Sequence, residues 1–401
     1  MYLKMENFQK DQQIQKIIDP YEEGVEYIYE INKKEYLASA FINKGKFGPV
    51  ASFQKSKTEQ YVTIKKISNA YESPPKGKNV LRQLSILSFV NHPNIIKLLD
   101  IIIPEKEDYE NVYLVEEYME SNLERLIITN CFNYKEDKIM IPWFIYQILQ
   151  GIHYLHSCKI MHRDIRSSNI LIDEKGNIKI CGFGNAIGFD NCENTIKGET
   201  NDFISEKGIL SCQAPEILAS KKKNKNSYDE KIDLWGVGCI MAELYTNIIP
   251  FFPPVKINKK KWICQLNGIF KKLGKPSKDE ILKFASKERM KDILKFHSFE
   301  KMKSDELFPN IKDNNALDLL NKFLCINPKE RISIKEAINH PFFDVIKEFQ
   351  KSDDFCESNK IFINEYKQKI EEMEKRNAFF NEQIFFYKNE IFSKQKSIHS
   401  N

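Results

Sequence analysis

The fold is decided by residues 161–169, which read Met-His-Arg-Asp-Ile-Arg-Ser-Ser-Asn, and by residues 180–184, which read Ile-Cys-Gly-Phe-Gly. A third stretch, Ala214-Pro215-Glu216, follows them along the chain. Gly182 stands at the centre of the second stretch, and a glycine has no side-chain oxygen with which to bind a hard cation. The three stretches indicate a known fold, while the glycine puts the chemistry of that fold in question.

These stretches resemble the catalytic loop, the metal-binding loop and the end of the activation segment of protein kinases. The resemblance implies that Asp164 occupies the general-base position and that Asn169 is a metal ligand, with the positive charge of Arg166 close to them. The second loop reads Asp-Phe-Gly in the family, so Gly182 replaces the aspartate that holds magnesium. We therefore expect Asn169 to be the remaining metal ligand and magnesium binding to be weak or absent.

The resemblance extends upstream, to the part of a kinase that binds the nucleotide. Residues 62–65, Val-Thr-Ile-Lys, are similar to the strand whose lysine contacts the phosphates of ATP. The glutamate that holds this lysine in the family is replaced by Gln83, which brings no charge. Residues 117–119 are the implied hinge, with Glu116 as gatekeeper. The implied nucleotide-binding positions are Ile42, Gly45, Gly48, Val50, Thr63, Lys65, Glu117, Met119 and Leu171.

Several positions that have packing roles in the family are intact. The resemblance implies that His162 and Phe183 stack in a hydrophobic spine and that Asp233 anchors the catalytic loop. It also implies an ion pair between Glu216 and Arg331. Phosphate-handling positions have changed while packing positions remain, as expected of a fold kept for binding rather than for chemistry.

Four segments resemble the mitogen-activated protein kinases of the CMGC group: residues 144–157, residues 233–243, residues 265–269 and residues 273–276. Kinases of that group carry a Thr-x-Tyr phosphorylation site in the activation segment, where this chain has Ile204-Ser205-Glu206. Double phosphorylation therefore cannot switch this segment, and Ser205 is the one candidate modification site at that position.

Hydrophobic patterning predicts an α+β protein with the two-lobed kinase layout. Residues 37–118 read as β-branched and aromatic runs with one helical stretch near residues 81–90, which predicts a small β-rich lobe. Residues 121–343 have longer helical periodicities, as at 141–156 and 231–245, which predict a larger helical lobe. The kinase-like domain is thus placed at residues 37–343.

The two ends of the chain are predicted to lie outside this domain. Residues 1–36 are polar and weakly patterned, and we interpret them as an N-terminal arm. Residues 344–401 form a C-terminal extension in which residues 361–396 carry apolar side chains at heptad positions, without Pro or Gly. This segment is either a two-stranded coiled coil, with a homodimer as the consequence, or one amphipathic helix packed on the large lobe.

Composition excludes several other classes of protein. The 401 residues are 42% hydrophobic and 29% charged, as in ordinary globular proteins, and the net charge of +5 does not indicate nucleic-acid binding. The odd count of nine cysteines argues against a disulfide framework. The polar first residues and the absence of an apolar run of ~20 residues predict a cytoplasmic or nuclear protein that does not span a membrane.

Three functions remain open from the sequence. The chain is a pseudokinase that acts as a signalling scaffold or regulator, a weakly active Ser/Thr kinase, or an assembly factor that acts through residues 361–396. ATP is a candidate ligand for the first two, and protein partners are expected for the first and the third.

Overall fold

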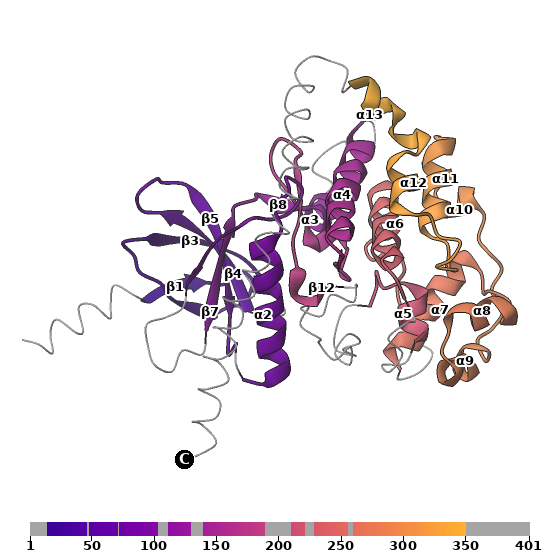
Figure 1. The fold of residues 1–401 in the computed structure, drawn as a ribbon, viewed down its shortest axis with the longest axis horizontal. Coiled ribbons are helices and arrows are strands. Elements are labelled where there is room, and N and C mark those ends of the chain that lie inside the picture. The colour runs from indigo at the N-terminus through magenta and orange to yellow at the C-terminus, as the bar shows by residue number, and fades with distance from the viewer. Residues whose placement is uncertain are drawn as a thin grey trace, which may run out of the picture.

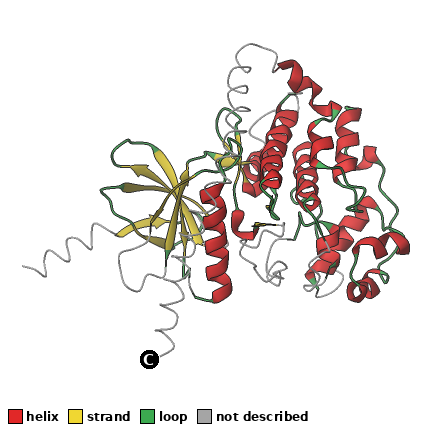
Figure 2. Cartoon of the chain, viewed as in Figure 1, coloured by secondary structure: helices red, strands yellow, loops and turns green. Residues whose placement is uncertain are grey.

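The computed structural model describes residues 14–45, 48–70, 72–102, 111–129, 139–188, 210–220, 228–255 and 260–349. These residues form two lobes, a small one rich in strands and a larger one built from helices (Figure 1 and Figure 2). The predicted order, a β-rich unit followed by a helical unit, is confirmed.

The small lobe is built on an antiparallel sheet with the strand order β3-β4-β5-β7-β6. Its strands are β3 (Tyr36–Gly45), β4 (Gly48–Lys55), β5 (Tyr61–Ile67), β6 (Leu98–Ile102) and β7 (Val112–Glu117). Side chains alternate between the two faces of a sheet, and helix α2 (Pro74–Phe89) covers one face, where Val80 packs with Ile67 and Leu114. The predicted helix near residues 81–90 is therefore present and begins earlier.

The opposite face of the sheet is covered by a hairpin of β1 (Ile14–Ile18) and β2 (Glu26–Glu30). Ile17 and Tyr29 are buried in one cluster with Phe53 and Tyr113, and the rings of Tyr29 and Phe53 lie 5.1 Å apart. From Ile14 onward, the segment interpreted as an arm is part of the small lobe. The physical reason is that Ile17 and Tyr29 face the sheet and bury apolar area that the sheet would otherwise expose.

The large lobe is helical, apart from short strands near its contact with the small lobe. Its helices are α3 (Leu123–Thr129), α4 (Met140–Ser157), α5 (Pro215–Ala219), α6 (Lys231–Thr246), α7 (Lys261–Leu273), α8 (Lys278–Phe284), α9 (Lys287–Ile293), α10 (Ser304–Leu307), α11 (Asn314–Phe323), α12 (Ile334–Ile338) and α13 (Asp344–Phe349), with a 3-10 turn at Pro341–Phe343. Helices α4 and α6 confirm the predictions at residues 141–156 and 231–245.

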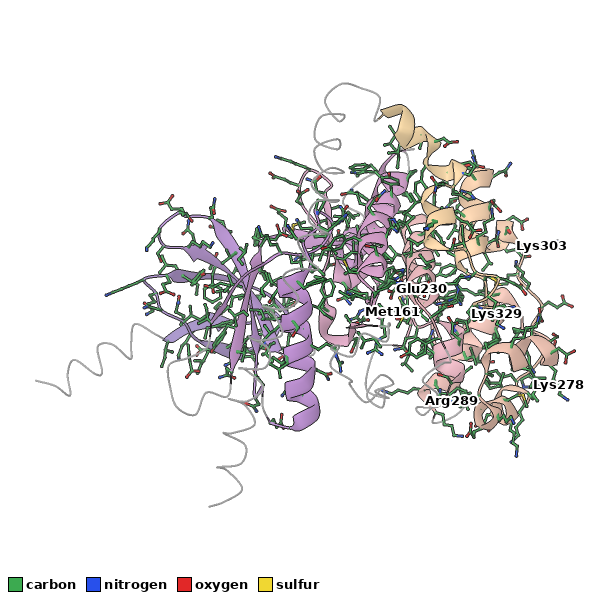
Figure 3. The ribbon with its side chains drawn as sticks, viewed as in Figure 1. Met161, Glu230, Lys278, Arg289, Lys303 and Lys329 are labelled. Atoms are coloured by element: carbon green, nitrogen blue, oxygen red, sulfur yellow. The ribbon has the colours of Figure 1, made fainter. Side chains whose placement is uncertain are left out.

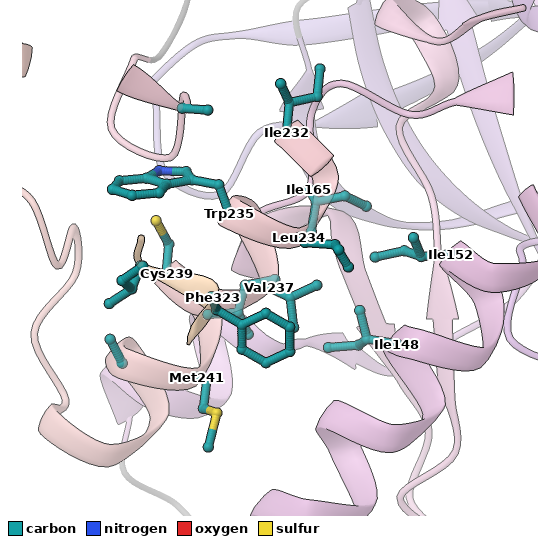
Figure 4. Packing of buried hydrophobic residues seen from close by; sticks show 14 of the residues in the cluster. Ile148, Ile152, Ile165, Ile232, Leu234, Trp235, Val237, Cys239, Met241 and Phe323 are labelled. Atoms are coloured by element: carbon teal, nitrogen blue, oxygen red, sulfur yellow. The ribbon is translucent and has the colours of Figure 1, made fainter. Parts of the chain in front are cut away.

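Helix α6 is the centre of the large lobe, because every residue from 232 to 244 is buried. A helix that is apolar on all sides belongs in a core. Ile148 and Ile152 of α4 and Phe323 of α11 belong to the core cluster around it (Figure 4). The charged side chains Lys278 and Lys303 lie instead on the exposed outer side of this lobe (Figure 3).

Short strands and turns bring the functional segments to the lobe contact. The strands are β8 (Ser121–Asn122), β9 (Ile160–Met161), β10 (Ile170–Ile172), β11 (Ile178–Ile180) and β12 (Ile187–Gly188), and they form two small sheets, β11-β10-β8 and β12-β9. Two 3-10 turns, η1 (Ser167–Asn169) and η2 (Phe183–Asn185), follow β9 and β11. None of the described helices is long and apolar enough to cross a membrane.

Candidate active site

The segment between β9 and η1 is anchored by hydrogen bonds to the carboxylate of Asp233 on α6. Asp233 Oδ1 accepts a hydrogen bond from the Arg163 amide at 2.7 Å, and Oδ2 accepts one from the His162 amide at 2.9 Å. The Nε2 atom of His156 lies 2.9 Å from the same Oδ2 atom. Burial acts to raise the pKa of Asp233, but these contacts outweigh burial and hold the pKa below its usual value. The predicted anchoring role of Asp233 is therefore visible in its contacts.

Asp164, the candidate general base, has both carboxylate oxygens engaged. Arg166 Nε lies 3.3 Å from Oδ1 in an ion pair, and Asn185 Nδ2 donates to Oδ2 at 3.3 Å. Asn185 is in turn held by Arg163, whose Nε donates to the Asn185 carbonyl oxygen at 2.6 Å. Each carboxylate oxygen has a second lone pair, so these contacts orient Asp164 and leave it able to accept a proton. The spacing of the motifs gave no reason to single out Asn185.

Gly182 adopts a left-handed backbone conformation, with φ of +88°, directly before η2. A Cβ atom at this position would lie 2.7 to 2.9 Å from the terminal atoms of Asn169. Asn169 itself is fixed, because its Nδ2 donates to the Asp164 carbonyl oxygen at 2.8 Å and its carbonyl oxygen accepts from the Cys181 amide at 2.9 Å. The amide of Asn169 therefore occupies the space that a side chain at position 182 would need.

The rings of His162 and Phe183 stack as predicted. Their centroids lie 4.9 Å apart in an edge-to-face arrangement, and both residues are fully buried. His162 Nε2 lies 2.9 Å from the Cys181 carbonyl oxygen, and burial lowers the pKa of the imidazole. Helix α2 packs directly on η2, so this stack joins the small lobe to the large lobe.

The predicted ion pair between Glu216 and Arg331 is present and fully buried. Arg331 Nη1 lies 2.7 Å from Glu216 Oε1, and its Nη2 donates to Oε2 at 2.9 Å, so the pair is bidentate. Both side chains have an exposed fraction of 0%. The guanidinium carbon also lies 5.2 Å from the ring centroid of Trp235 on α6. This pair joins α5 to the segment before α12, as a structural contact of the large lobe.

Two carboxylates at the end of β7 have different surroundings. Glu117 pairs with Lys179 of β11 at 2.9 Å and accepts from the Lys97 amide at 2.8 Å, which ties β7 to the large lobe. Glu116 is buried; burial raises the pKa of its carboxyl group and the charge of Lys65 opposes this rise. Sequence spacing could not have indicated either contact, because the partners lie on other strands.

The residues implied for nucleotide binding are distributed over strands of both lobes. Val50 faces Lys65 across β4 and β5, and Gly45 faces Gly48 at the end of the β3–β4 hairpin. Ile42 is on β3, Thr63 is on β5, and Leu171 is on β10 of the large lobe. Met119, at the predicted hinge, is buried.

Comparison with known proteins agrees with this geometry. The chain matches the family described as Protein kinase domain over residues 36–343. The chain belongs to the protein kinase family. It is 33% identical to Mitogen-activated protein kinase 13 of Arabidopsis thaliana over 325 residues, which are 81% of this chain and 84% of the relative. The resemblance inferred from the motifs is confirmed.

Two further relatives belong to the same group of kinases. Mitogen-activated protein kinase spm1 of Cytospora mali is 32% identical over 313 residues, 78% of this chain and 71% of the relative. Extracellular signal-regulated kinase 1 of Dictyostelium discoideum is 32% identical over 311 residues, 77% of this chain and 55% of the relative. The chain is therefore similar to mitogen-activated kinases of the CMGC group over most of its length.

Magnesium in a kinase is held by an aspartate and an asparagine together with phosphate oxygens. In this kinase Gly182 offers no side-chain ligand, and Asn169 offers a neutral amide oxygen. Among the described residues, no group of three or more His, Cys, Asp or Glu side chains is arranged to hold a metal ion. The protein donor set at this position is thus smaller than that of the family by one carboxylate.

Two predictions from the sequence concern residues that the structure does not describe. Ser205, the candidate modification site, lies in residues 189–209, and the predicted helix or coiled coil at residues 361–396 lies beyond Phe349. Both remain predictions from the sequence.

Proposed function

We propose that this chain is a mitogen-activated protein kinase-like pseudokinase that acts on protein partners as a signalling scaffold or regulator. The proposal is carried by Gly182, which removes the metal-binding carboxylate while the Asn169 side chain takes up the space beside it. ATP is the candidate ligand, with weak or absent magnesium. Lys65 would be the residue that contacts the phosphates of bound ATP.

The expected loss of activity is large, because two charged groups are missing. Removing one preorganised electrostatic contact costs about 3–4 kcal/mol, or ~10²–10³ in rate. Gly182 lacks the carboxylate that binds the metal, and Gln83 lacks the one that holds the lysine. Even partial additivity would reduce turnover from about 1–100 per second to a negligible level.

The deciding experiment compares phosphotransfer from ATP to a protein substrate by the full chain and by Asp164→Ala. A pseudokinase gives equal rates for the two proteins. A rate that falls on substitution would overturn the proposal. Gly182→Asp combined with Gln83→Glu is the converse experiment, in which Asn169 must first move aside to admit the new side chain.

Nucleotide binding is measured separately, by thermal unfolding with 1 mM ATP, first with magnesium and then with a chelator. A dissociation constant of about 10 µM would stabilise the protein by roughly 2.7 kcal/mol and raise the melting temperature by about 3 °C. The proposal predicts a shift that does not depend on magnesium. A shift that requires magnesium would favour an active enzyme.

A weakly active Ser/Thr protein kinase is the second candidate. Lys65, Asp164 and Asn169 are present, and the stack of His162 on Phe183 is assembled. The three relatives are named as kinases, which also favours this candidate. Its prediction is the opposite result in the phosphotransfer experiment.

The third candidate is an assembly factor that acts through residues 361–396, either as a coiled-coil homodimer or as a docked helix. A partner pull-down that survives deletion of residues 1–350 would support it. Light scattering tests the homodimer, which predicts twice the mass of one chain and a loss of that mass when residues 358–401 are deleted. For all three candidates we propose a location in the cytoplasm or nucleus, without nucleic-acid or membrane binding.

A further inference from the structure

The buried positions of α2 carry no carboxylate. Val80, Gln83 and Leu87 follow one another at helical spacing and have exposed fractions of 1%, 2% and 3%. In an active kinase the middle position carries the glutamate that holds the phosphate-binding lysine. Gln83 can donate and accept hydrogen bonds but cannot supply the negative charge.

A carboxylate is present on the neighbouring strand, on the same face of the sheet as Lys65. In the antiparallel pair of β5 and β7, Thr63 is opposite Glu116 and Lys65 is opposite Leu114. Residues opposite one another point to the same face, and Leu114 packs on this face with Val80 of α2. Lys65 and Glu116 are therefore diagonal neighbours, at a Cβ separation of about 7 Å that long side chains can span.

Burial makes the charged form of Glu116 costly. Its exposed fraction is 9%, and an isolated carboxylate in such a place either pairs with a cation or becomes protonated. Two charged groups act on it, the Lys65 ammonium and the Glu117 carboxylate. Glu117 is directed elsewhere, because it pairs with Lys179 at 2.9 Å. Burial, followed by the charge of Glu116, raises the pKa of the Cys181 thiol to about 12, and the charge of Lys65 opposes this rise.

We infer that Glu116 is the positioning residue for Lys65, and that it replaces from the sheet the carboxylate missing from α2. The inference rests on the proposed function for one point, namely that Lys65 faces a nucleotide. Strand register sets the separation of the two residues, whereas in active kinases a shift of the helix makes or breaks the ion pair. The separation of the two residues is therefore independent of the position of α2.

The test uses the full chain without nucleotide and measures how fast an amine-specific acetylating reagent labels Lys65 at pH 8, by mass spectrometry. Loss of a neighbouring carboxylate favours the neutral, reactive amine. Glu116→Gln should therefore label several-fold faster than the wild-type chain. The matched control, Glu117→Gln, should label no faster than the wild type, because that carboxylate pairs with Lys179 and its loss leaves Glu116 more fully ionised.

Rescue separates a charge effect from loosened packing. Adding Gln83→Glu to Glu116→Gln should restore slow labelling, because it returns a carboxylate to the family position, whereas adding Gln83→Met should not. Glu116→Asp, which keeps the charge, should label at an intermediate rate and gives a second measurement if Glu116→Gln does not fold. Wild-type labelling rates in both Glu116 variants, or fast labelling that Gln83→Glu leaves unchanged, would overturn the inference.

The proposed function is tested independently in the same assay. Addition of ATP should protect Lys65 of the wild-type chain from the reagent. Absence of protection would count against the nucleotide site and would leave the pairing of Lys65 with Glu116 to be decided by the nucleotide-free rates.

Discussion

Substituting Gly182 by alanine should destabilise the large lobe through the Asn169 side chain. The new Cβ atom would lie 2.7 to 2.9 Å from the terminal atoms of Asn169, which must then turn away and give up its 2.8 Å bond to the Asp164 carbonyl oxygen. A lost hydrogen bond costs about 1 kcal/mol. The left-handed φ of +88° adds about 1 kcal/mol once the reduced entropy of the unfolded chain is counted. We expect a total loss of about 2 kcal/mol.

A double-mutant cycle isolates the contact with Asn169. Asn169→Ala alone should cost about 1 kcal/mol for the same hydrogen bond. In the double variant the alanine side chain at position 182 meets no amide, so the total should remain about 2 kcal/mol rather than 3. The backbone and entropy effects of alanine are common to both backgrounds and cancel. The double variant should therefore be about 1 kcal/mol more stable than the sum of the two single losses would give.

The assay is equilibrium urea unfolding followed by tryptophan fluorescence, because Trp143, Trp235 and Trp262 all lie on helices of the large lobe. The matched control is Gly176→Ala. Its φ is +81°, but its Cβ atom would meet only Phe144 at 3.7 Å, so it should cost about 1 kcal/mol and be additive with Asn169→Ala. Additivity within about 0.3 kcal/mol for Gly182→Ala as well would refute the steric argument.

Three further predictions concern the large lobe. Arg331→Met leaves Glu216 buried and uncompensated and should lower the unfolding free energy by about 3–5 kcal/mol, whereas a loss below 1 kcal/mol in urea titrations would contradict the buried pair. Burial raises the pKa of Glu243 from 4.5 to about 7, so between these pH values the folded state keeps a proton that the unfolded state loses. The unfolding free energy of the wild type should therefore fall by about 3 kcal/mol relative to Glu243→Gln as the pH rises from 4.5 to 7. Parallel pH profiles for the two proteins would exclude this. Gly268→Ala, in α7, should destabilise by more than about 1 kcal/mol despite the better helix propensity of alanine, because its Cβ would lie 2.1 Å from the Pro253 carbonyl oxygen; a higher melting temperature would show that this backbone can retreat.

The sequence predicted the parts of the fold that repeat regularly. Helices α4 and α6 begin and end within one residue of the predicted ranges, because their apolar residues recur at helical spacing. Helix α2 begins at Pro74, well before the predicted range, because its first turns hold proline, lysine and glycine and show no apolar stripe. The β1–β2 hairpin was missed because Ile14, Ile18 and Ile28 are exposed, which obscures the alternation.

The site was predictable as far as its residues follow one another along the chain. Asp164, Asn169 and Gly182 were identified by motif. In the structure the Asn169 side chain donates a hydrogen bond to the Asp164 carbonyl oxygen and lies next to Gly182. The contact of Asn185 with Asp164 and the position of Glu116 beside Lys65 were not predictable. They depend on a turn geometry and a strand register, which no spacing of motifs specifies.

Gly182 also explains how the fold could lose a metal ligand without losing stability. The backbone at this position is left-handed, a conformation that costs a residue with a side chain about 1 kcal/mol and costs glycine nothing. The buried contacts of Asp233 and of Glu216 with Arg331 do not involve position 182. Replacement of the aspartate by glycine therefore removes strain from the loop and leaves the skeleton intact. Strain of this kind is a common feature of active sites, where it is retained for the sake of the chemistry. Its absence here supports the proposed pseudokinase function.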